Sequence, residues 1–132
     1  EYAERVGRLK FRPMRGFLTG FIDLLFLSGG RYYLADWKAS WLGPEVTDYA
    51  PERLDDAMDG HHYTLQSLLY AVAVHRFVGL RVPGYSYEQH FGGVFYLFLR
   101  GMVGTPGTGV FRRRPSEGLI EELSTLFETG RP

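Results

Sequence analysis

Two apolar runs separated by a glycine pair constrain the fold of this chain most strongly. Residues 17–27 and 32–38 are rich in aliphatic and aromatic side chains, and Gly29 and Gly30 lie between them. Glycine reaches positive φ without steric cost, and a short glycine turn between β-forming runs is typical of a hairpin. The sequence therefore predicts two adjacent antiparallel strands.

The rest of the chain predicts a long helix, another strand and a final helix. The helical stretch opens near Pro51 and runs towards Gly79, and we expect Gly60 to bend or split it. Residues 82–90 are rich in turn formers, and residues 91–99 are apolar on both faces, as in a strand covered on both sides. The remaining predicted elements are a glycine-rich loop at 101–109, a short strand at 110–111 and an amphipathic helix from Ser116.

The composition indicates one globular domain that spans residues 1–132. An apolar content of 45% is too high for a disordered tail, and the absence of cysteine excludes disulfides, a thiol nucleophile and a thiolate zinc site. A chain without cysteine suits the reducing cytoplasm. The longest apolar run is too short to span a bilayer, so we expect no membrane anchor. Because the chain lacks an initiator methionine, we interpret it as a fragment of a longer protein.

Charge is balanced overall but unevenly distributed. Fifteen basic side chains match fifteen acidic ones, which weakens any prediction that the whole surface attracts nucleic acid. Bases gather in a lead-in segment at residues 1–15 and at Arg112, Arg113 and Arg114, whereas acids gather at residues 45–59. Each run is typical of a solvated face. Alternatively, the three arginines contact DNA phosphates, and the acidic segment repels DNA or contacts a partner.

Three charged residues contradict their apolar surroundings. Asp23 lies in the first run, and Asp36 and Lys38 close the second, two positions apart and so on one face of a strand. The hairpin makes the two strands neighbours, which allows Asp23 to lie close to that face but does not fix the register. Two interpretations remain open, namely a cross-strand salt bridge and a site in which both carboxylates bind a divalent cation.

A cation between the two acids would support hydrolysis of a phosphodiester. Oxygen ligands suit Mg²⁺ or Mn²⁺, which polarise a phosphate and lower the pKa of bound water. Lys38 would orient or deprotonate that water, or neutralise charge on the phosphate. Lys38 is one of only two lysines in a chain with thirteen arginines. The use of lysine here indicates that a compact amine is required at this position.

The predicted helix supplies a second polar pair. Gln66 and Tyr70 are four residues apart and share a helical face in an otherwise apolar stretch. A helix laid over the hairpin would aim them at the acids or at a bound phosphate, and the alternative is a tyrosine packed in the core. His61 is a candidate DNA contact, or it pairs with nearby acids. No histidine spacing indicates a zinc site, and no phosphate-binding loop for ATP occurs.

Several ordered strings resemble the nuclease domain of the RecB family, the beta subunits of bacterial exodeoxyribonuclease V. The likeness covers the chain from about residue 14. The strings are Gly-Phe-Leu-Thr-Gly-Phe-Ile-Asp at 16–23, Leu-Ala-Asp-Trp-Lys-Ala-Ser-Trp-Leu-Gly at 34–43, His-His-Tyr-Thr-Leu-Gln-Ser-Leu-Leu-Tyr at 61–70 and Tyr-Glu-Gln-His-Phe-Gly-Gly at 87–93.

This resemblance implies an α/β fold of the PD-(D/E)xK superfamily, a restriction-endonuclease-like core in which helices flank a mixed β-sheet, here truncated at its N-terminus. It also implies site residues: Asp23 and Asp36 as metal-binding carboxylates, Lys38 as the motif lysine, the Trp37 carbonyl as an extra metal ligand, and Gln66 and Tyr70 as the Gln-x-x-x-Tyr signature.

The function implied by the resemblance is metal-dependent hydrolysis of DNA. The domain would be the nuclease of a RecBCD-type helicase–nuclease in double-strand-break repair and recombination, with Mg²⁺ or Mn²⁺ as cofactor. Its partners would be single-stranded DNA ends and the RecC and RecD subunits. The sequence departs from the pattern in two places: Ile22 replaces the superfamily proline, and residues 1–15 match neither the upstream histidine nor the upstream glutamate. We therefore expect the isolated fragment to be weakly active or inactive.

Two other functions remain open at this stage. The first is a non-catalytic module that keeps the nuclease fold in order to bind DNA or partner subunits. The second is a stand-alone resolvase or restriction-type nuclease of the same superfamily.

Overall fold

Four strands form one sheet in the computed structural model, which describes residues 19–129. The expected basic lead-in and the first two residues of the expected first strand lie outside the described residues. The outer strands pair antiparallel with their neighbours and the two central strands are parallel, so the expected mixed sheet is confirmed. In spatial order the strands are β1 (Leu24–Ser28), β2 (Arg31–Lys38), β3 (Phe91–Phe98) and β4 (Val110–Arg113).

The predicted hairpin is present, but its first strand is shorter than expected. Gly29 and Gly30 form the turn at φ values of 55° and 77°, where other residues are strained. β1 begins at Leu24, so the prediction that Asp23 lies inside a strand is wrong. The reason is local, because the Asp23 carboxylate accepts the Trp37 N–H that a backbone carbonyl of a longer strand would accept.

The predicted long helix is split at the expected glycine. Gly60 ends the first helix, and His62 then adopts a left-handed conformation (φ 59°) before the second helix begins. The segment expected to be turns contains one helical turn, and the final helix follows Ser116 as predicted. The helices are η1 (Val46–Tyr49), α2 (Pro51–Gly60), α3 (Tyr63–Gly79), α4 (Tyr87–His90), η2 (Leu99–Gly101) and α5 (Glu117–Thr129).

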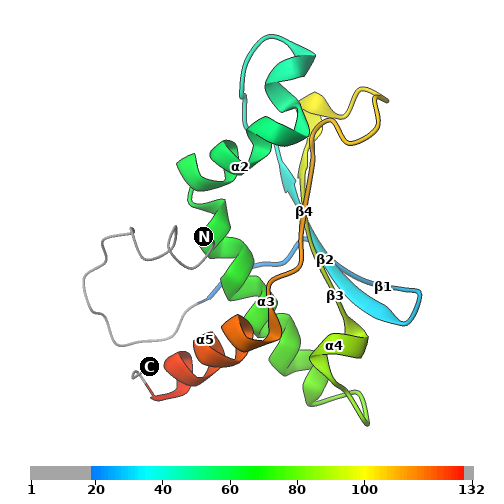
Figure 1. Ribbon diagram of the computed structural model, residues 1–132, viewed down its shortest axis with the longest axis vertical. Helices are drawn as coiled ribbons and strands as arrows, with labels where there is room; N and C mark the ends of the chain where they lie inside the picture. The colour runs from blue at the N-terminus through cyan, green and yellow to red at the C-terminus, as the bar shows by residue number, and fades with distance from the viewer. Residues whose placement is uncertain (1–18, 130–132) are drawn as a thin grey trace.

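Helices α2, α3 and α5 lie on the same side of the sheet (Figure 1). Two core clusters form beneath them. One joins Leu34 and Val94 of the sheet to Leu68 of α3, and the other joins Tyr96 of the sheet to Leu54 of α2. All five side chains are essentially fully buried. Burial of this apolar face holds the two helices against the central strands.

The opposite face of the sheet is aromatic and half-buried. The rings of Phe26 and Tyr33 stack at 5.3 Å between centroids, and Phe95 lies 5.8 Å from Tyr33. Phe95 and Leu97 are half-buried and the other residues of β3 are buried, so the described residues cover this face of the strand in part. None of the helices in this range is long and apolar enough to cross a membrane.

Candidate functional site

A buried ion pair lies at the end of β2. Asp36 and Lys38 are 4% and 9% exposed, and the Lys38 Nζ atom is 2.5 Å from Asp36 Oδ1. Strand alternation places both side chains on the same face of the sheet as Leu34, beneath the helices. Because charges are seldom buried without a partner, this pair is a special feature of an otherwise apolar sheet face.

The Lys38 ammonium is enclosed by acceptors and aromatic rings. It donates a 2.8 Å hydrogen bond to Gln66 Oε1. It also lies 4.0 Å from the centroid of the Tyr63 ring and 5.0 Å from that of Tyr96. Each neighbour presents negative charge or π-electron density to the amine, which fixes the position of the Nζ atom.

Gln66 links the lysine to two tyrosines. Its Nε2 atom donates to the Tyr70 hydroxyl at 3.2 Å, and its Oε1 atom also accepts from the Tyr96 hydroxyl at 3.2 Å. The four-residue spacing on α3 places Gln66 and Tyr70 on one helical face, directed at β2 and β3. This network brings the predicted helical pair to the predicted strand pair.

Asp23, which directly precedes β1, contacts the same strand. Its Oδ2 atom accepts a 2.9 Å hydrogen bond from the backbone N–H of Trp37, the residue between Asp36 and Lys38. Asp23 is exposed and directly precedes Leu24, the first residue of β1, which pairs with Ala35.

The backbone beside Asp23 supports this arrangement. The N–H and C=O groups of one strand residue face the same neighbouring strand, so the Trp37 carbonyl is directed to the Asp23 side of β2. Gly20, just upstream, lies against Tyr70: a Cβ atom at Gly20 would be only 2.9 Å from Cε1 of the tyrosine ring. A glycine at this position lets the segment that carries Asp23 pass close to α3.

The donor set fits a hard divalent cation. Asp23 and Asp36 supply carboxylate oxygens and Trp37 supplies a carbonyl oxygen, and Mg²⁺ usually takes one or two protein carboxylates with water and phosphate oxygens. No group of three or more His, Cys, Asp or Glu side chains suited to a metal occurs within residues 19–129. Carboxylate and carbonyl oxygens are donor types that suit Mg²⁺ or Mn²⁺ better than a structural zinc site.

The arginines and the histidine singled out in the sequence lie apart from one another. Arg112 is exposed and lies 5.5 Å from the Phe95 ring on the aromatic face. Arg113 pairs with Asp55 of α2. Arg114 donates a 2.8 Å hydrogen bond to the Phe91 carbonyl and also contacts Glu88. The three guanidinium groups are thus directed to different parts of the structure.

His61 lies nearer to the buried pair. Its ring stacks on Tyr63 with 5.3 Å between centroids, and Tyr63 is the residue beneath the Lys38 ammonium. Tyr63 and Tyr96 were not singled out in the sequence analysis. Tyr63 carried a usable signal, because it precedes Gln66 by three residues and Tyr70 by seven, which places all three on one helical face.

The fold and site together define a class: an α/β protein with a mixed sheet, whose central strand carries an Asp-x-Lys motif buried beneath a Gln-x-x-x-Tyr helix. No family model matches the chain. Curated proteins do match, and the chain is homologous to a segment of RecB, a subunit of the RecBCD enzyme.

Three relatives illustrate the match. The RecBCD enzyme subunit RecB of Escherichia coli (strain K12) is 47% identical over 120 residues, which cover 90% of this chain. The Haemophilus influenzae subunit is 49% identical over 119 residues. The Mycobacterium tuberculosis subunit (strain H37Rv) is 45% identical over 140 residues, which cover 98% of this chain. The chain spans only 10% to 13% of the length of these relatives.

Proposed function

We propose that this chain carries the metal-dependent nuclease centre of a RecB-type enzyme and has a PD-(D/E)xK core. One observation carries the proposal: the Asp23 carboxylate is hydrogen-bonded to the backbone amide between Asp36 and Lys38. This bond holds Asp23 beside the segment of β2 that carries the other acid and the amine. The homology supports this proposal, because the relatives are named as RecBCD enzyme subunit RecB.

In this proposal Asp23, Asp36 and the Trp37 carbonyl hold a Mg²⁺ or Mn²⁺ ion. When bound, such an ion polarises a phosphodiester and makes water a better nucleophile. The Lys38 Nζ atom, held by Gln66 and Asp36, neutralises charge that develops on the phosphate oxygens or orients the attacking water. Tyr63 and Tyr96 exclude bulk water from one side of the amine.

In this proposal Gln66 and Tyr70 are positioning residues and not catalytic residues. Gln66 accepts from the amine and donates to Tyr70, so the pair fixes where Lys38 points. Removal of the Gln66 amide would leave the ammonium free to reorient towards Asp36 alone. We expect such a change to lower the rate of cleavage more than the affinity for metal.

The proposed substrate is single-stranded DNA, and the proposed setting is a RecBCD-type complex. The relatives are RecBCD enzyme subunits by name, which supports association with RecC-type and RecD-type partners. Arg112, Arg114 and His61 are exposed candidates for DNA contact, while the ion pair of Arg113 and the backbone contacts of Arg114 leave these two arginines less available to phosphate.

The test is a cleavage assay on the complete polypeptide that the gene encodes. Asp36→Asn removes one charge from the site, and Asp56→Asn, an exposed position on α2, is the matched control. A metal ligand contributes several kcal/mol, so we expect Asp36→Asn to lower Mg²⁺-dependent degradation of single-stranded DNA at least about a hundredfold. Retained cleavage in a folded Asp36→Asn protein would defeat the proposal and would favour a non-catalytic module.

A further inference from the structure

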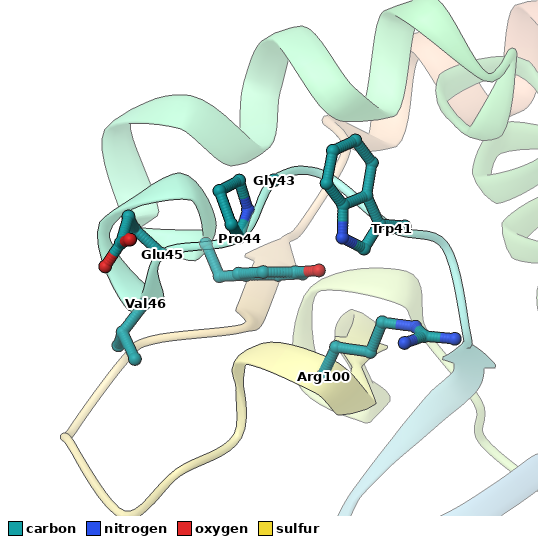
Figure 2. Close-up of a pocket in the computed structure, with 7 residues that line it drawn as sticks. Trp41, Gly43, Pro44, Glu45, Val46 and Arg100 are labelled. Carbon is teal, nitrogen blue, oxygen red and sulfur yellow. The ribbon is translucent and has the colours of Figure 1, made fainter.

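A pocket opens where the chain leaves β2. Figure 2 shows it in close-up, bounded by the segment that follows the strand and by η2. Its lining combines an indole, a guanidinium group and small apolar side chains. The lining residues are Trp41, Gly43, Pro44, Glu45, Val46, Tyr49 and Arg100.

One end of the pocket pairs an aromatic surface with a cation. The Trp41 side chain is 65% exposed, an unusual degree for an indole. Arg100 donates a 2.9 Å hydrogen bond from Nε to the Ala39 carbonyl, which orients the guanidinium group. In Figure 2, Trp41 and Arg100 lie at the same end, and Glu45 lies at the other end. An anion is therefore favoured at the Trp41 end and disfavoured at the Glu45 end.

The Trp41–Arg100 end of the pocket is formed by residues that follow the candidate metal site closely in the sequence or in the sheet register. Lys38 pairs with Phe98 at the last position of the β2–β3 register, and Arg100 follows Phe98 by two residues. Trp41 follows Lys38 by three residues, a separation of at most about 10 Å even in an extended chain. A flexible single strand of DNA bound at the candidate metal site would therefore reach the pocket.

Tyr49 forms a rigid wall of the pocket. It is 3% exposed, and its hydroxyl accepts a 3.1 Å hydrogen bond from the Leu42 N–H. Gly101 packs so closely against the same residue that a Cβ atom at Gly101 would overlap Tyr49. The wall thus fixes the loop that carries Trp41 relative to η2, which carries Arg100.

We propose that the Trp41–Arg100 end of the pocket binds one nucleotide of a DNA single strand. The base stacks on the Trp41 indole, and an adjacent phosphate pairs with the Arg100 guanidinium group. Stacking tolerates any base, because every base has a π-face, and this suits a substrate that is not read by sequence. The inference rests on the proposed nuclease function, since it places the strand next to the same metal site.

Tryptophan fluorescence tests this subsite directly. The chain has two tryptophans, so Trp37→Phe leaves Trp41 as the sole reporter and Trp41→Phe leaves Trp37. We titrate each variant of this 132-residue chain with oligo(dT) in EDTA, which prevents cleavage, and follow binding in parallel by anisotropy of a labelled strand. We expect saturable quenching with the Trp41 reporter, little with the Trp37 reporter, and none with an abasic strand of equal length.

Two substitutions separate stacking from charge. Trp41→Ala is expected to weaken oligo(dT) binding about five- to a hundredfold, the range for loss of one stacked base. Arg100→Gln is expected to weaken binding and to make its salt dependence shallower by about 0.7, the value for one phosphate on a single strand. Arg81→Gln, at an exposed arginine that stacks on Phe77 at the far end of α3, is the matched control and should change neither quantity.

The outcomes distinguish failure of the subsite from failure of the nuclease proposal. Anisotropy that reports bound oligo(dT) without quenching of Trp41 would overturn the subsite, and so would the absence of any binding by the chain. The separate Asp36→Asn cleavage assay would still decide whether the nuclease proposal is correct. Conversely, quenching of Trp41 together with retained cleavage in Asp36→Asn would uphold the subsite and reject the metal site.

Discussion

The buried pair of Asp36 and Lys38 leads to a sharp prediction about stability. At 2.5 Å and an effective dielectric constant of about 20, the attraction between the two charges is about 7 kcal/mol, much of which desolvation offsets. Removal of either partner leaves the other charge buried. We therefore expect Asp36→Ala and Lys38→Met each to lower the free energy of unfolding by about 3–5 kcal/mol.

The double variant should behave differently. Once both charges are absent, no desolvation penalty remains, so we expect Asp36→Ala/Lys38→Met to be less destabilised than either single variant. Urea unfolding of all four proteins, followed by circular dichroism at pH 7, gives the coupling energy. Effects that add to within about 0.5 kcal/mol would refute the reasoning, because independent sites behave in that way.

Three further predictions concern other parts of the structure. Gly20→Val should push the Asp23 segment off Tyr70 and weaken Mn²⁺ binding in a calorimetric titration, and unchanged affinity would contradict this packing. Burial, aided by nearby glutamates, raises the pKa of Tyr85 from 10.0 to about 12, so folding stability should fall as pH rises from 10 towards 12. Tyr85→Phe should flatten that alkaline fall in urea unfolding, and an identical pH profile would rule out this tyrosine as its source. Tyr87→Phe removes a buried 2.7 Å hydrogen bond to the Pro115 carbonyl and should cost about 1–3 kcal/mol of unfolding free energy, whereas a change below about 0.5 kcal/mol would count against the bond.

Local features of the sequence predicted the hairpin and the helix break. Gly29 and Gly30 permit the positive φ values of the turn, and Gly60 ends α2 where the pattern indicated a bend or split. The turn depends on positive φ values that glycine favours, whereas the break after α2 uses the left-handed conformation of His62. The shared face of Asp36 and Lys38 followed from strand alternation alone.

Other features depend on tertiary contacts that a sequence does not encode locally. The start of β1 was misplaced because apolar residues continue upstream, whereas the pairing ends where the Asp23 carboxylate takes the Trp37 N–H. The arginine run suggested one cationic patch, but strand alternation and an acid on α2 direct Arg113 away from Arg112. The contribution of Tyr96 to the lysine site depends on the parallel pairing of β2 with β3.

The most direct test of the central claim is a calorimetric titration of Mn²⁺ into the complete polypeptide that the gene encodes. If Asp23 and Asp36 share one cation, Asp23→Asn and Asp36→Asn should each weaken Mn²⁺ binding at least about tenfold, and Asp56→Asn should leave it unchanged. Equal Mn²⁺ affinity in all four proteins would contradict a metal site at this edge of the sheet.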